Sequence, residues 1–217
     1  KTEEISEISD DVCIMRNGKN VYSGFTADLT RDKYTYYLTG RNLKPDYFVP
    51  ENISEEPVLK VENLTLKNQK CKNVSFELKK GEILGITGLL GSGRTELAMT
   101  LFGMEKIESG KIYLNGKEVK ITSPIAAQKM KIGYVPEDRL TEGLCLQQSI
   151  ADNITLSSLK RLSNALSIIK KRDILKDAEI WRKKFSIATD DVNKFASTLS
   201  GGNQQKIVLA KWLSNDL

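Results

Sequence analysis

A serine and two glycines stand at the start of an apolar helical pattern, in the run Leu199-Ser200-Gly201-Gly202-Asn203-Gln204. The Ser200 hydroxyl and the amides that open a helix at about Asn203 converge where an anion can sit, and the helix dipole favours negative charge there. The two glycines leave the backbone bare for close approach. The pattern predicts a phosphate-binding helix start, and an ordinary glycine-rich helix start fits the Ser-Gly-Gly triplet equally well.

A second glycine loop occurs earlier, in the run Gly88-Leu89-Leu90-Gly91-Ser92-Gly93-Arg94-Thr95. It follows an apolar run at 83–87 with strand character and precedes a helical pattern at 97–102. Strand, glycine loop and helix in this order are the context of a P-loop, whose amides donate to phosphate oxygens and whose threonine, here Thr95, ligates magnesium. A turn whose glycines serve packing alone is the alternative. We predict nucleotide binding by these residues: Gly88, Gly91, Ser92, Gly93, Arg94, Thr95 and Glu96.

Arg94 departs from the P-loop pattern, which has lysine at this position. A guanidinium is a larger, planar fork that binds phosphate without fitting the transition-state geometry of a lysine. We therefore expect nucleotide binding to survive better than hydrolysis.

The segment 199–206 resembles the signature sequence of ATP-binding-cassette (ABC) ATPases, in the form found in bacterial importers of simple sugars. The run Pro136-Glu137-Asp138-Arg139, which ends a strand predicted over 131–135, is similar to the second cassette of that group. In the family a glutamine usually stands at this strand end, where it senses the metal of the nucleotide. The resemblance adds Glu137 to the nucleotide-binding residues, and a solvated acidic turn is the alternative.

The resemblance implies an α/β P-loop NTPase fold of ABC type, with an antiparallel β subdomain and an α-helical subdomain at about 149–198. Asn115-Gly116 predicts a type I′ hairpin within 111–121, and Asn17-Gly18 predicts another within 12–23. Ser149 and Asp152 predict a helix start, and an apolar stripe from Ile174 to Phe185 predicts a longer helix. A short helix is expected at 31–38.

Residues 1–42 resemble the tail of a preceding nucleotide-binding domain, and 43–57 are polar and proline-punctuated, as in a linker. Residues 58–217 resemble a second cassette that is incomplete. The sequence contains no apolar-Asp-Glu run and no histidine, so the residues that would hold metal and polarise the attacking water are not found. We expect a piece truncated before the Walker B strand, inactive in hydrolysis by itself, with unpaired sheet edges open to dimerisation or domain swapping.

The cysteine usage favours a reducing compartment. Its three cysteines are far apart in the sequence, which argues against a disulfide framework. No run approaches the roughly twenty apolar residues of a membrane span, so we expect membrane contact through a partner. The basic cluster at 160–172 lacks interleaved aromatic residues, which favours a solvated face over a nucleic-acid site.

These patterns predict part of the ATP-binding subunit of a bacterial monosaccharide importer, with ATP and magnesium as cofactors. The resemblance implies permease subunits and the preceding cassette of the same parent chain as partners, and a peripheral place on the cytoplasmic face of the membrane. A non-hydrolytic structural or regulatory module is the second hypothesis, favoured by Arg94 and Glu137. A soluble cassette protein that acts on ribosomes or repair complexes is the third, and the lack of nucleic-acid stacking residues counts against it.

Overall fold

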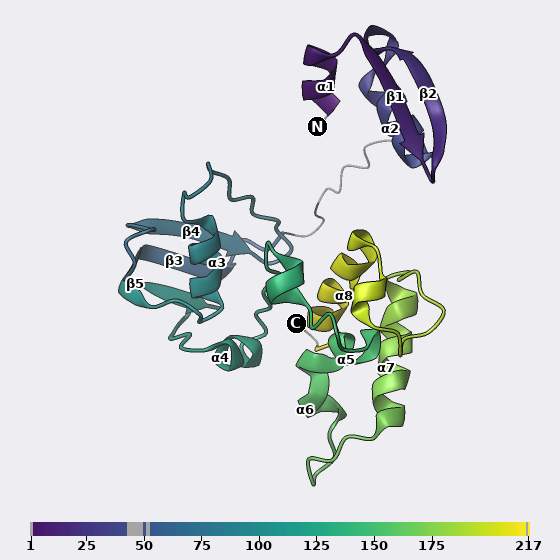
Figure 1. The fold of residues 1–217 in the computed structure, drawn as a ribbon. Helices are drawn as coiled ribbons and strands as arrows, with labels where there is room; N and C mark the ends of the chain where they lie inside the picture. The colour runs from purple at the N-terminus through teal and green to yellow at the C-terminus, as the bar shows by residue number, and fades with distance from the viewer. Residues whose placement is uncertain (1, 43–49, 51–52, 216) are drawn as a thin grey trace. The chain divides into compact units, whose positions relative to one another are not determined.

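The computed structural model describes residues 2–42, 50, 53–215 and 217, and it divides into two units, Lys1–Pro50 and Glu51–Leu217 (Figure 1). The division lies within the predicted linker 43–57, most of which falls outside the described residues.

The first unit is a hairpin with helices. Its elements are α1 (Thr2–Ile8), β1 (Asp11–Arg16), β2 (Lys19–Phe25), η1 (Thr26–Asp28) and α2 (Arg31–Thr39). Asn17 and Gly18 have φ angles of 52° and 74°, so the predicted hairpin with two positive φ angles is confirmed. The predicted helix is confirmed as α2, which is capped by the Thr30 side chain and ends at Gly40 in the left-handed region.

The second unit contains a four-stranded antiparallel sheet in the order β4-β3-β5-β6. Its strands are β3 (Pro57–Leu66), β4 (Val74–Lys79), β5 (Ile107–Leu114) and β6 (Lys117–Val119). Asn115 and Gly116 between β5 and β6 have φ angles of 49° and 75°, which confirms the second predicted hairpin. Leu97 of helix α3 (Arg94–Leu101) packs with Leu64 of the sheet in one buried apolar cluster.

The rest of the second unit is helical. Its elements are α4 (Pro124–Lys129), η2 (Arg139–Gly143), α5 (Ile150–Thr155), η3 (Leu156–Ser158), α6 (Leu159–Leu162), α7 (Lys171–Lys184), η4 (Ala196–Thr198) and α8 (Gly201–Leu213). The Ser149 hydroxyl accepts a hydrogen bond of 2.9 Å from the Asp152 amide, so the predicted helix start is confirmed.

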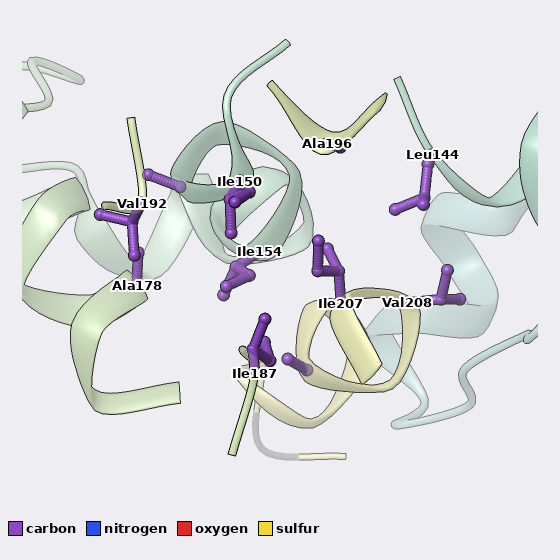
Figure 2. Close-up of a cluster of buried hydrophobic side chains, with 11 residues drawn as sticks. Leu144, Ile150, Ile154, Ala178, Ile187, Val192, Ala196, Ile207 and Val208 are labelled. Carbon is purple, nitrogen blue, oxygen red and sulfur yellow. The ribbon is translucent and has the colours of Figure 1, made fainter. Parts of the chain in front are cut away.

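The helical core joins segments that are far apart in the sequence (Figure 2). Ile150 and Ile154 of α5 and Ile207 of α8 are all 0% exposed, and their side chains lie together. The predicted apolar stripe of α7 packs on the same cluster through Ala178 and Trp181. Because α8 shares this core, the helix that carries the signature is held by the helices before it.

Trp212 connects this helical core to the sheet, since its side chain packs on both buried clusters. Its ring centroid lies 5.2 Å from that of Phe102, which follows α3, in an edge-to-face arrangement. Trp212 therefore joins two separate buried clusters, one in the helices and one on the sheet, within the second unit.

Two predicted strands are wrong, because neither 83–87 nor 131–135 forms a strand. Ile83 is 73% exposed and Ile86 is 48% exposed. A strand of a parallel sheet gains its hydrogen bonds from neighbouring strands and its burial from helices on both faces. Within the described residues no strand pairs with either segment, and residues 83–87 are irregular and exposed to solvent.

The exposed apolar segment predicts self-association. Leu89 is 87% exposed and Leu90 is 96% exposed, beside the unpaired run 83–87. Such a surface favours contact with a second chain. We expect light scattering to show a mass that rises with protein concentration, and the double variant Leu89→Ser/Leu90→Ser to reduce this rise.

Leu166→Ser is the matched control, because Leu166 is 78% exposed outside this segment. An unaltered chain that stays monomeric at every concentration tested would contradict the prediction.

Candidate functional site

The glycine loop bends sharply into helix α3. Gly91 and Gly93 have φ angles of 80° and 90°, in the region that glycine adopts without strain. A β-carbon added to Gly93 would lie 2.6 Å from the Lys70 carbonyl oxygen and 2.7 Å from the Cys71 sulfur. Position 93 therefore requires glycine for two reasons, the backbone conformation and the lack of space.

The start of α3 offers backbone donors to a ligand. The first hydrogen bond of the helix joins the Leu97 amide to the Gly93 carbonyl at 2.9 Å, so the amides of the residues between them have no intrahelical acceptor. Gly88, Gly91, Ser92, Arg94 and Thr95 are all exposed around this helix end. The arrangement suits an anion, which the helix dipole attracts.

Thr95 and Glu137 lie together, although they are far apart in the sequence. The Thr95 hydroxyl donates to a Glu137 carboxylate oxygen at 3.4 Å, and both residues are exposed. A hydroxyl and a carboxylate are oxygen ligands of the kind that magnesium prefers, so these two residues fit the metal that accompanies a bound nucleotide. The structure thus places Glu137 beside the loop to which the sequence assigned it.

Glu96 is oriented by a lysine from the connection between β3 and β4. Its carboxylate accepts a hydrogen bond from the Lys70 ammonium, and this contact lowers the pKa of Glu96 and raises that of Lys70. Next to this lysine, burial raises the pKa of the Cys71 thiol, which donates to the Gly93 carbonyl at 3.1 Å. The loop is therefore supported from the sheet side by Lys70 and Cys71.

The signature segment forms the N-terminus of α8, which begins at Gly201 rather than at the predicted Asn203. Ser200 is the N-cap residue, but its side chain accepts from the Asn203 amide group at 3.0 Å instead of from the backbone. Asn203 in turn accepts from the Ala188 amide at 2.9 Å. Asn203 therefore stabilises the turn, and Ser200 and Gly202 stay exposed.

Two other signature residues face the helical core. Gln204 is 7% exposed and donates to the Ala196 carbonyl at 3.3 Å. Leu199 packs against the helical cluster. These contacts fix the direction in which the exposed part of the signature points.

The run Glu137-Asp138-Arg139 connects the two glycine motifs. Glu137 contacts Thr95 at one end, as described above. At the other end, a β-carbon on Gly201 would lie 2.5 Å from a terminal nitrogen of Arg139, so the guanidinium packs on the start of α8. The Arg139 Nε is buried without a hydrogen-bond partner among the described residues. The run 137–139 therefore contacts the P-loop through Glu137 and the signature through Arg139.

A family model described as "ABC transporter" matches residues 71–217, more than half of the chain. The chain belongs to the ABC transporter family. The P-loop and the signature both lie within the matched range.

Curated relatives of this ABC protein are sugar import proteins by name. The ribose import ATP-binding protein RbsA of Clostridium tetani is 43% identical over 213 residues, which are 98% of this chain and 42% of the relative. The galactose/methyl galactoside import ATP-binding protein MglA of the same organism is 42% identical over 98% of this chain and 42% of the relative. The xylose import ATP-binding protein XylG of Thermoanaerobacter pseudethanolicus is 39% identical over 100% of this chain and 44% of the relative. The chain spans less than half the length of these relatives.

Solved structures share the ABC fold. The structure of cbiO1 from Clostridium perfringens, part of the ABC transporter complex cbiONQ, aligns with a TM-score of 0.58 and 23% identity over 75% of this chain and 63% of that one. The dimeric, post-hydrolysis structure of the ATP-binding cassette MJ0796 with ADP and Pi aligns with a TM-score of 0.60 and 21% identity over 73% of this chain and 70% of that one. Among the residues that the structure describes, no helix combines the length and apolar character needed to cross a membrane.

Sequence reasoning missed the residues of this ABC site that act through tertiary contacts. Lys70 and Cys71 sit in a polar turn with no motif of their own. Outside the site, the buried Asn153 was also missed: it donates to the Cys145 carbonyl and accepts from the Cys145 amide, and so holds α5 to the loop that follows η2. The sequence did point to Arg139, because this residue belongs to the run that resembles the sugar-importer group. No sequence pattern predicted its contact with Gly201.

Proposed function

We propose that the chain is the nucleotide-binding part of an ABC importer for monosaccharides and that it binds MgATP at Gly88–Thr95. The glycine loop at the start of α3 carries the proposal, because Gly91 and Gly93 hold the left-handed conformations that open its backbone to phosphate. The names of the ribose, galactose and xylose import relatives support the substrate class.

The proposal gives separate roles to the glycine loop, to Thr95 with Glu137, and to the signature. The amides that open α3 and the Arg94 guanidinium would hold the phosphates, and Thr95 with Glu137 would hold magnesium. ATP supplies the phosphoanhydride bond whose cleavage drives import. Ser200 and Gly202 are exposed at the start of α8, where they would face the nucleotide of another cassette.

The proposed partners are those of an ABC importer for monosaccharides. We propose that permease subunits of a sugar importer and the preceding cassette of the same parent chain contact this part, at the cytoplasmic face of the membrane. Sugar specificity would reside in the permease and its binding protein, because the exposed groups at the glycine loop and Glu137 are suited to phosphate and metal.

A non-hydrolytic module is the second candidate function. Arg94 at the lysine position of the P-loop favours it, because a guanidinium binds phosphate as a planar fork rather than as a compact charge. In this form the chain would bind ATP to close a dimer, and the other cassette would perform the chemistry.

We expect calorimetry to show binding of MgATP by the chain, and phosphate release by the same samples to stay at background. Arg94→Ala removes an exposed guanidinium at the helix start, so we expect a roughly tenfold loss of affinity. Arg172→Ala is the matched control, because Arg172 is also exposed in the first turn of a helix, α7. Unchanged affinity in Arg94→Ala would remove Arg94 from the phosphate site, and no binding by the unaltered chain would overturn the proposal.

Arg94→Lys separates the two candidate functions. If Arg94 is what limits hydrolysis, the lysine variant of a parent chain that contains the full set of catalytic residues turns over ATP faster than the unaltered parent. If hydrolysis by that parent does not change, Arg94 is not the cause of the impairment.

A further inference from the structure

The ion pair between Lys70 and Glu96 lies at the edge of the P-loop. Glu96 belongs to the first turn of α3, directly after Arg94 and Thr95. The Lys70 ammonium contacts the Glu96 carboxylate, and the Lys70 carbonyl oxygen closes the space beside Gly93. Lys70 therefore touches the loop through both its side chain and its backbone.

The negative charge of Glu96 repels a phosphate bound at this loop. A carboxylate in the first turn stabilises a helix because it lies in the positive field of the helix end. A phosphate bound to the loop uses the same field, so an unmasked carboxylate there repels it. The Glu96 side chain is only 18% exposed, so water screens its charge less than at an open surface position.

Lys70 is placed to cancel this repulsion. Its side chain is 56% exposed and its ammonium reaches the Glu96 carboxylate from the sheet side of the loop. The pair adds no net charge, which leaves the helix end, Arg94 and the Glu137 carboxylate beside Thr95 to set the potential that a polyphosphate meets.

We propose that Lys70 controls nucleotide affinity by masking the carboxylate of Glu96 at the start of α3. Lys70 is thus a positioning residue that acts through Glu96, and Glu96 has a role other than the direct nucleotide contact expected from the sequence. The inference rests on the proposed function, since it needs MgATP to bind at this loop.

The test is a double-mutant cycle with MgATP in calorimetry on the full chain. Lys70→Ala leaves the Glu96 carboxylate unmasked, and we expect affinity to fall roughly five- to tenfold. Lys70→Ala/Glu96→Gln removes the repulsion as well, and we expect affinity within about twofold of the unaltered chain. Because the effect is electrostatic, the loss in Lys70→Ala shrinks as salt is raised from low to high concentration.

Lys111→Ala is the matched control. Lys111 is also 56% exposed and ion-paired, with Glu118 on the sheet, so its loss removes a comparable pair away from the loop. We expect no change in MgATP affinity in this variant. Lys70→Arg keeps the positive charge, and we expect it to retain affinity.

A second readout needs no nucleotide. A carbon-13 NMR titration of the Glu96 carboxyl measures the pair directly, and Lys70→Ala is expected to raise the pKa of Glu96 toward its ordinary value. Circular dichroism spectra of Lys70→Ala and the unaltered chain are compared alongside, because an unfolded chain would give the same rise in pKa.

The outcomes are distinct. Failure of the unaltered chain to bind MgATP overturns the proposed function and the inference with it. Binding that is unchanged in Lys70→Ala overturns the inference alone. A double variant as weak as Lys70→Ala means that Lys70 contacts the nucleotide itself, and a loss of affinity in Glu96→Gln alone means that Glu96 does; either result overturns the masking role.

Discussion

We expect Gly93→Val to abolish the proposed MgATP binding and to lower the stability of the chain. A valine at this position would have to adopt a φ of 90°, and its β-carbon would meet the Lys70 carbonyl oxygen at 2.6 Å. A β-branched residue at positive φ is strained, and the backbone contact cannot be relieved by turning a flexible side chain. We expect a destabilisation of about 2–4 kcal/mol in chemical denaturation and at least a hundredfold loss of affinity in calorimetry.

Two glycine controls separate the causes. Gly116→Ala places a side chain at a φ of 75° with no atom within 4 Å, so it measures the cost of the backbone conformation alone. Gly85→Ala has neither a positive φ nor a close neighbour, so its stability is expected to stay within about 0.5 kcal/mol of the unaltered chain. Nucleotide affinity that survives in a folded Gly93→Val would show that the loop is not the binding site.

Ile207→Ala destabilises the second unit by about 2–5 kcal/mol, because it leaves a cavity where the side chain is fully buried. Ile207 packs in the same buried cluster as Ile150 and Ile154 and belongs to the helix whose first turn is the signature (Figure 2). The loss therefore loosens the packing that holds the N-terminus of α8. Urea denaturation followed by circular dichroism measures the change in free energy of unfolding.

Leu209→Ala on the same helix is the control. Leu209 is 36% exposed, so its truncation removes less buried area and is expected to cost less than about 1 kcal/mol. Equal effects of the two variants would contradict the assignment of Ile207 to the core.

Much of the local structure could be predicted because short-range forces decide it. The Asn17-Gly18 and Asn115-Gly116 turns form as expected, since asparagine and glycine tolerate the positive φ angles that a tight hairpin requires. The helix after Ser149 begins where its hydroxyl can cap an amide. The apolar stripe of α7 packs inward because its period matches the helix.

The prediction of strands at 83–87 and 131–135 was wrong for a different reason. Their sequences have the apolar character of buried strands, but a strand has no hydrogen bonds of its own. Whether such a run forms a strand depends on a neighbouring strand to pair with. Among the described residues, no strand pairs with either run. A helix makes its hydrogen bonds within its own segment. The formation of α2 and α7 therefore did not depend on a pairing partner and could be predicted from the sequence.

The sequence predicts the candidate nucleotide site in outline, because glycine spacing, the arginine and the threonine are local properties of one loop. The surroundings of that loop follow from the tertiary packing alone. It placed Lys70 and Cys71 against Gly93, and it packed Arg139 on Gly201. These contacts join residues that are distant along the chain, and they exist because the packing of sheet, helix and loop brings the side chains within a few ångströms, which no local pattern encodes.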